Sequence, residues 1–168
     1  MDLNIAGHAA LIPASSSGLG KASAKALARE GVDVVVNGRH DDRLADAVEE
    51  LDAVATGEVV AQAGDITDPA DVETLVETTL DAFGRLDHLV TNAGGPPSGP
   101  FTETTDQDWY EAYDLLVMSV VRLVRACEAP LRADGGGTIV HVTSRSVKEA
   151  IDSLVLSKSV RMSVIGLE

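Results

Sequence analysis

The chain has 168 residues, 45% apolar and 3% aromatic, so we expect a single domain (residues 1–168) with an aliphatic core rather than two domains. Its formal net charge of −14 opposes binding to nucleic acid or to an anionic membrane. The one cysteine, Cys127, excludes an internal disulfide.

The charge balance is one-sided, with 27 Asp and Glu against 13 Lys and Arg. Salt screens repulsion between like charges, so such a surface suits a protein that works at high salt. A halophilic source is a hypothesis, and ordinary acidic solubility is its alternative.

Residues 1–4 lack a basic region followed by an apolar core, and no apolar run approaches membrane-spanning length. We therefore expect a soluble, cytoplasmic protein.

Short β-type runs alternate with helical periodicity along the chain. In chain order we expect a strand at 8–13, a helix at 18–29, a strand at 33–37, a helix at 41–54, a strand at 57–63, a helix at 69–83, a strand at 86–91, a helix at 106–131, a strand at 138–143 and a helix from 153 onward. This alternation predicts an α/β domain, in which a parallel sheet carries helices on both faces. Ligands bind such sheets beyond the carboxyl ends of the strands.

The stretch Ala14-Ser15-Ser16-Ser17-Gly18-Leu19-Gly20 lies between the first strand and the first helix. Small residues let the backbone approach a pyrophosphate, and a helix N-terminus directs its N–H groups and dipole at the anion. A plain strand-to-helix turn is the alternative. The position after the first strand of an α/β pattern favours the phosphate loop.

The second strand ends in Asn37-Gly38-Arg39. A cofactor with a free ribose 2′-hydroxyl usually meets an acidic residue here. This sequence has glycine and arginine instead, and a guanidinium suits a 2′-phosphate. The residues favour NADP(H) over NAD(H), unless Arg39 is a solvated turn residue.

The loop at 14–20, Gly64-Asp65-Ile66, Thr91-Asn92-Ala93-Gly94 and Thr143-Ser144 together resemble the short-chain dehydrogenase/reductase family, in its β-ketoacyl-carrier-protein-reductase-like branch. The resemblance implies a Rossmann-type doubly wound parallel sheet in three α/β/α layers. It also implies that the fold is C-terminally incomplete, because family members continue with a sixth strand, a substrate-covering loop and a seventh strand. The expected cofactor-binding residues follow from their position at the strand ends together with the family resemblance. They are Ala14, Ser15, Ser16, Ser17, Gly18, Leu19, Gly20, Gly38, Arg39, Asp65, Ile66, Asn92, Ala93 and Gly94.

The catalytic positions depart from the family pattern, which uses an Asn, a Ser and a Tyr-x-x-x-Lys turn. By position, Ser144 matches the Ser, whereas Leu116 replaces the Asn, Ser157 the Tyr and Arg161 the Lys. We expect Ser144 to polarise a carbonyl, Ser157 to pass a proton through water and Arg161 to anchor the ribose. An arginine stays protonated and does not shuttle protons itself.

Other candidates are weaker. Tyr113 lies one turn before Leu116, which stands at the position of the family's Asn. Two readings stay open: Tyr113 points at the catalytic site, or it is an ordinary helix aromatic. The four histidines have no metal-ligand spacing, so no metal is expected. His141 is expected to face the core or a neighbouring helix.

Three functions therefore stay open. The first is an NADP(H)-dependent oxidoreductase of the CH–OH class, acting on a small-molecule carbonyl/alcohol pair. The second is a non-catalytic nucleotide-binding homologue, such as a sensor or partner subunit, and the third is an inert truncated fragment. By analogy with the family, we expect a homo-oligomer through the fourth and fifth helices. The long helix at 106–131 would present Leu115, Met118, Val121 and Leu123.

Overall fold

The structure is a computed structural model that describes residues 3–149 and 151–167. It contains a five-stranded sheet in the order β3-β2-β1-β4-β5, and all paired strands are parallel. This confirms the doubly wound parallel sheet expected from the sequence. The strands are β1 (Ala9–Ile12), β2 (Asp33–Gly38), β3 (Val59–Ala63), β4 (His88–Thr91) and β5 (Thr138–His141).

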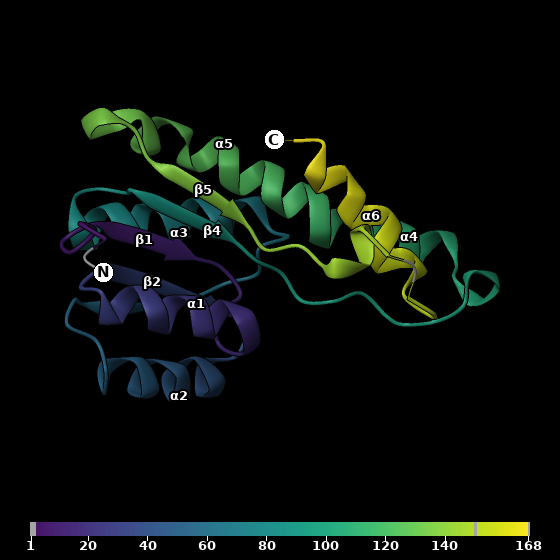
Figure 1. Cartoon of the computed structure of the whole chain (residues 1–168), viewed down its shortest axis with the longest axis horizontal. Coiled ribbons are helices and arrows are strands. Elements are labelled where there is room, and N and C mark those ends of the chain that lie inside the picture. The colour runs from purple at the N-terminus through teal and green to yellow at the C-terminus, as the bar shows by residue number, and fades with distance from the viewer. Residues whose placement is uncertain (1–2, 150, 168) are drawn as a thin grey trace.

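Helices cover both faces of this sheet, as Figure 1 shows. Along β1, Ala10 and Ile12 pack with α1 and α2, whereas Leu11 packs with α3 and α5 on the opposite face. Strand side chains alternate between faces, so an uninterrupted apolar run is what burial on both sides requires. The helices are α1 (Gly18–Arg29), α2 (Asp41–Asp52), α3 (Pro69–Phe83), α4 (Asp106–Tyr113), α5 (Ser119–Arg132) and α6 (Val155–Ile165).

The long helix expected at 106–131 is interrupted. Thr105 caps α4 through a reciprocal capping box with Asp108, as the sequence suggests. A π-helical segment (Asp114–Met118) then joins α4 to α5, so the expectation of one regular α-helix was wrong. Leu116 lies in this segment, is 2% exposed and packs in a cluster with α6.

The structure corrects one residue of the expected oligomer surface. Leu123 is 1% exposed and packs in the core with Leu75 and Cys127. It therefore faces the sheet rather than a second subunit. The π-helical segment ends at Met118, and Leu123 stands five residues further along the regular helix α5. That spacing turns Leu123 about 140° around the helix axis from Met118, so the two side chains lie on different faces.

The strand β5 differs from the other strands in its burial. Ile139 is 39% and Val140 is 51% exposed. The strand lies at the edge of the sheet and pairs with β4 on one side.

Beyond the carboxyl ends of the strands, α4 and α6 lie together (Figure 1). Within the described ranges, no helix is long and apolar enough to cross a membrane.

Candidate cofactor cleft

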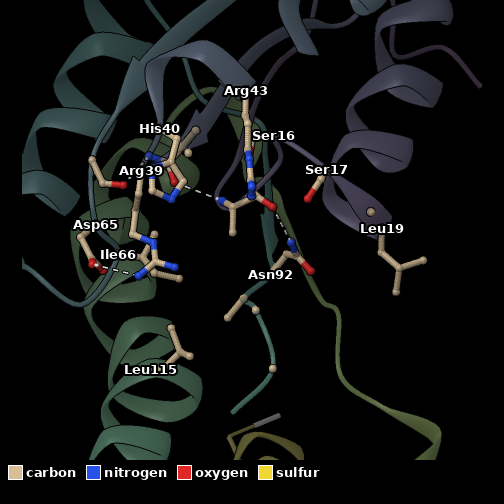
Figure 2. Close-up of a pocket in the computed structure, with 18 residues that line it drawn as sticks. Ser16, Ser17, Leu19, Arg39, His40, Arg43, Asp65, Ile66, Asn92 and Leu115 are labelled. Atoms are coloured by element: carbon tan, nitrogen blue, oxygen red, sulfur yellow. Dashed lines mark hydrogen bonds and ion pairs between the residues drawn. The ribbon is translucent and has the colours of Figure 1, made fainter. Parts of the chain in front are cut away.

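A cleft of about 390 Å³ lies at the carboxyl ends of β1, β2, β3 and β4 (Figure 2). Four strand-end segments that are far apart in the sequence meet there, as expected for a doubly wound sheet. Its lining residues are Ala14, Ser16, Ser17, Gly18, Leu19, Asn37, Gly38, Arg39, His40, Arg43, Gly64, Asp65, Ile66, Asn92, Ala93, Gly94, Gly95 and Leu115.

The loop after β1 forms one wall. Ala14 has a φ of 49°, in the left-handed region that favours glycine. Ser17 is the N-cap of α1 but makes no side-chain capping bond. The first N–H groups of α1 therefore have no capping side chain, and Ser17 and Gly18 line the cleft in front of them. Such a helix start is suited to bind an anion.

Two residues of the expected loop shape it from behind and are not among the lining residues. Ser15 is fully buried; its Oγ donates to the carbonyl of Ile12, and its backbone N–H donates to the carbonyl of Asn37 at 2.7 Å. Gly20 is also buried, and a Cβ there would lie 2.6 Å from Nδ2 of Asn92. Only glycine permits this close approach between α1 and the end of β4.

Asn37 joins three strand ends, a role that the sequence analysis missed. Its Oδ1 accepts the backbone N–H of Ala14 at 3.1 Å, and its Nδ2 donates to the carbonyls of Gln62 and Gly64, each at 3.0 Å. Asn37 is 1% exposed. The available signal was a polar side chain at the end of a valine-rich strand, since buried polar groups are normally hydrogen-bonded.

Basic side chains gather at the end of the cleft beside β2. Arg39, His40 and Arg43 all line it, although the chain as a whole carries a net charge of −14. Arg39 was predicted from the sequence, whereas His40 and Arg43 were not. Arg43 lies in the first turn of α2, which starts directly after Arg39 and the N-cap residue His40.

Asp65 lies beside Arg39 on the same side of the cleft (Figure 2), with 3.8 Å between its Oδ2 and Nη1 of the arginine. Its Oδ1 accepts hydrogen bonds from the backbone N–H and the hydroxyl of Thr67, at 2.9 and 2.8 Å. Partial burial opposes ionisation of Asp65, but the Thr67 hydrogen bonds and the charge of Arg39 outweigh it and hold the pKa of Asp65 below its usual value.

The expected catalytic residues lie beyond this cleft, after β5 and on α6. Nε of Arg161 donates to Oγ of Ser157 at 3.2 Å, and its Nη2 donates to the carbonyl of Gly94 at 3.1 Å. Burial lowers the pKa of Arg161 from its ordinary value. Arg161 thus joins α6 to the cleft-lining loop after β4. Ser144 follows β5, and its Oγ accepts hydrogen bonds from Ser146.

Two further candidates are placed away from the cleft. Tyr113 lines an apolar groove with Trp109, Tyr110, Met118 and Val160, among other residues. Nδ1 of His141 lies 2.7 Å from Oγ1 of Thr91, so this histidine joins β5 to β4. Across residues 3–149 and 151–167, no group of three or more His, Cys, Asp or Glu side chains has the arrangement of a metal site.

Comparison with known proteins identifies the family. The family model for short chain dehydrogenase matches residues 8–157. A Mycobacterium tuberculosis protein named (5R,7aS)-5-hydroxy-7a-methyl-1-oxo-2,3,5,6,7,7a-hexahydro-1H-indene-carboxyl-CoA reductase is 37% identical over 148 residues, which cover 83% of this chain and 56% of that protein. The 3-oxoacyl-[acyl-carrier-protein] reductase of Synechocystis is 35% identical over 135 residues, covering 80% of this chain and 55% of that protein.

A solved structure agrees with these sequence relatives. L-sorbose reductase from Gluconobacter frateurii, complexed with NADPH and L-sorbose, superposes with a TM-score of 0.94 at 34% identity and covers 99% of this chain and 64% of that chain. The chain therefore spans between about half and two thirds of the length of its relatives. From the matched family model, the sequence relatives and the shared fold, we conclude that this chain belongs to the short-chain dehydrogenase/reductase family and is related to its 3-oxoacyl-carrier-protein reductases.

Proposed function

We propose that the chain binds NADP(H) in the cleft and supports the interconversion of a carbonyl and an alcohol. The observation that carries the cofactor preference is the cluster of Arg39, His40 and Arg43 at one end of the cleft. Guanidinium groups bind phosphate through charge-assisted, bidentate hydrogen bonds. An acidic chain that gathers basic groups at this position favours a ligand with an additional phosphate.

The described residues fit a dinucleotide along the whole cleft. The uncapped start of α1 at Ser17 and Gly18 would hold the pyrophosphate. Arg39 and Arg43 would hold the 2′-phosphate, and Asp65 with Ile66 would flank the adenine. The loop that begins at Asn92 would hold the ribose near the reacting end.

Three side chains outside the cleft would act on the substrate. The bound cofactor supplies or accepts the hydride, and the protein supplies position and polarity. Ser144 would donate a hydrogen bond to the carbonyl oxygen, where negative charge develops during reduction. Because Oγ of Ser157 accepts a hydrogen bond from Arg161, its own proton is available to a water or a substrate oxygen. Arg161 would anchor the ribose of the cofactor and contribute fixed positive charge.

A non-catalytic nucleotide-binding protein is the second candidate. Leu116, Ser157 and Arg161 stand where the family uses Asn, Tyr and Lys, and Leu116 is buried with an apolar side chain. Serine is a poor general acid unless a neighbour activates it. These substitutions favour a protein that binds the cofactor without turning it over.

Carbonyl-dependent oxidation of NADPH separates the two candidates. We expect turnover on part of a panel of ketones and aldehydes, a large decrease to a still measurable kcat in Ser144→Ala, and no change in the control Ser163→Ala, which alters an exposed serine of α6. NADPH binding with no turnover on any carbonyl would support the non-catalytic candidate. Absence of NADPH binding would refute both.

We also propose that the chain forms a homo-oligomer through α4 and α6. Tyr110 is 71% and Tyr113 is 46% exposed, and both line the apolar groove with Val160 of α6. A second copy that covers this groove would bury aromatic surface. Light scattering is expected to give more than the monomer mass for the wild type and the monomer mass for Tyr110→Asp. A monomeric wild type would refute the proposal.

A further inference from the structure

We propose that Ser146 is a positioning residue, which fixes the hydroxyl of Ser144 as a hydrogen-bond donor toward the substrate. This inference rests on the proposed oxidoreductase function. A short 3-10 turn (Arg145–Val147) follows β5; Ser144 is the N-cap of that turn and Ser146 lies within it. No role for Ser146 was expected from the sequence.

Ser146 makes two contacts with the same atom. Its backbone N–H donates to Oγ of Ser144 at 3.2 Å, and its hydroxyl donates to the same Oγ at 2.9 Å. Ser146 is fully buried, whereas Ser144 is half-buried. The inner serine is therefore shielded from water and directed at the outer one.

The consequence follows from the hydrogen-bonding capacity of a hydroxyl. A serine oxygen has two acceptor lone pairs and one O–H donor. The N–H and the hydroxyl of Ser146 occupy both lone pairs of Ser144, so the remaining hydrogen-bonding capacity of Ser144 is its own proton. A hydroxyl in this state donates to a carbonyl or alkoxide oxygen and does not act as a base. Hydrogen bonds in a chain also polarise each other, so Ser144 becomes a stronger donor.

A purely structural role would account for one of the two contacts. The backbone N–H contact is an ordinary N-cap interaction, which stabilises the short turn. The hydroxyl contact adds nothing to that cap. It orients Ser144, and removing it leaves the backbone contact intact.

A double-mutant cycle on carbonyl reduction tests this assignment. In Ser146→Ala we expect kcat to fall roughly five- to tenfold, the range of one buried hydrogen bond, with the Kd for NADPH unchanged. In the Ser144→Ala background the same substitution is expected to cause no further loss, because it acts through Ser144. Ser146→Thr, which keeps the hydroxyl, is expected to retain the wild-type kcat.

The outcomes separate this inference from the proposed function. An active wild type with an unchanged kcat in Ser146→Ala, or an equal loss in the Ser144→Ala background, would overturn the role of Ser146 alone. A wild type that does not reduce carbonyls would overturn the oxidoreductase proposal and this inference together.

A second measurement requires neither a variant nor turnover. NMR of serine Cβ in mixed light and heavy water is expected to show slow exchange of the Ser146 hydroxyl. Fast exchange would contradict its bond to Ser144.

Discussion

Nδ2 of Asn92, at the end of β4, donates a 2.9 Å hydrogen bond to the carbonyl oxygen of Ala14 in the loop after β1. A Cβ at Gly20 would lie 2.6 Å from this nitrogen and 2.7 Å from this oxygen. The three residues therefore depend on each other: the missing side chain of Gly20 makes room for the bond between the other two. This bond fixes the loop of the cleft against the sheet.

Gly20→Ala is expected to weaken both the cofactor site and the fold. The added methyl must displace Asn92 or the backbone at Ala14, and overpacking of this kind costs about 1–3 kcal/mol. We expect a lower free energy of unfolding in denaturant and a larger Kd for NADPH. Gly99→Ala is the matched control, because a Cβ at Gly99 meets no atom within 4 Å. Equal stability and affinity in Gly20→Ala and the control would show that the contact is unimportant.

Ser157→Tyr is expected to raise carbonyl reduction. Nε of Arg161 lies 3.2 Å from Oγ of Ser157, so a phenol at position 157 would stand beside a guanidinium. A neighbouring positive charge lowers the pKa of a phenol from about 10 and makes it a better general acid near neutral pH. A well-placed general acid contributes roughly 10²–10⁴-fold. Steady-state kcat measures the gain, and circular dichroism checks that the variant folds. A folded variant with no gain would show that proton delivery is not what limits the wild type.

The paired imidazoles of His8 and His88 predict a pH-dependent stability. Nδ1 of His8 lies 3.0 Å from Nε2 of His88, at the amino ends of β1 and β4. One ring must donate and the other accept, so double protonation breaks the contact. Burial and the neighbouring His8 lower the pKa of His88, and Arg85 adds to this while Asp87 opposes it.

Because the folded-state pKa of His88 lies below its unfolded value, the unfolded chain binds more protons in acid. The stabilisation is present above about pH 6.5 and is lost as the pH falls below it. We expect the melting temperature to decrease over this range in the wild type and to decrease less in His88→Gln. His40→Gln, which alters an exposed histidine, serves as the control. An identical pH profile in His88→Gln and the wild type would contradict this account.

The net charge of −14 predicts that salt stabilises the chain. Exposed like charges repel each other, and at about 1 M salt the screening length falls to about 3 Å. We expect the melting temperature to rise between low salt and molar potassium chloride, as the halophile hypothesis requires. A flat salt profile would reject that hypothesis and leave the acidic surface as a matter of solubility.

Much of the fold was predictable because its signals are local. Alternation of apolar runs with helical periodicity gave all five strands, and Asp68 before Pro69 marked the start of α3, where the Asp68 side chain accepts the N–H of Ala70. The π-helical segment at Asp114–Met118 was not predicted. The apolar residues there suit either helix type, and the choice depends on packing against α6.

The residues of the candidate site were likewise predicted only in part. The loop after β1 and Arg39 are adjacent to strand ends in the sequence, so their position in the cleft followed from the fold class. Asn37, Arg43 and the contact of Ser146 with Ser144 required the register of strands and the geometry of a short turn. Such long-range and hydroxyl-level contacts have no periodic signal. The location of the cleft was therefore predicted better than the details of its support.

Direct titration of the chain with NADPH and with NADH tests whether the cleft binds NADP(H) in preference to NAD(H). We expect NADPH to bind roughly 10- to 100-fold more tightly than NADH, the range of one charge-assisted hydrogen bond to the 2′-phosphate. Arg39→Ala is expected to remove most of this difference, and Arg132→Ala, an exposed arginine of α5, to leave it unchanged. Equal affinity for both nucleotides would contradict the NADP(H) preference, and binding of neither would contradict the cofactor cleft itself.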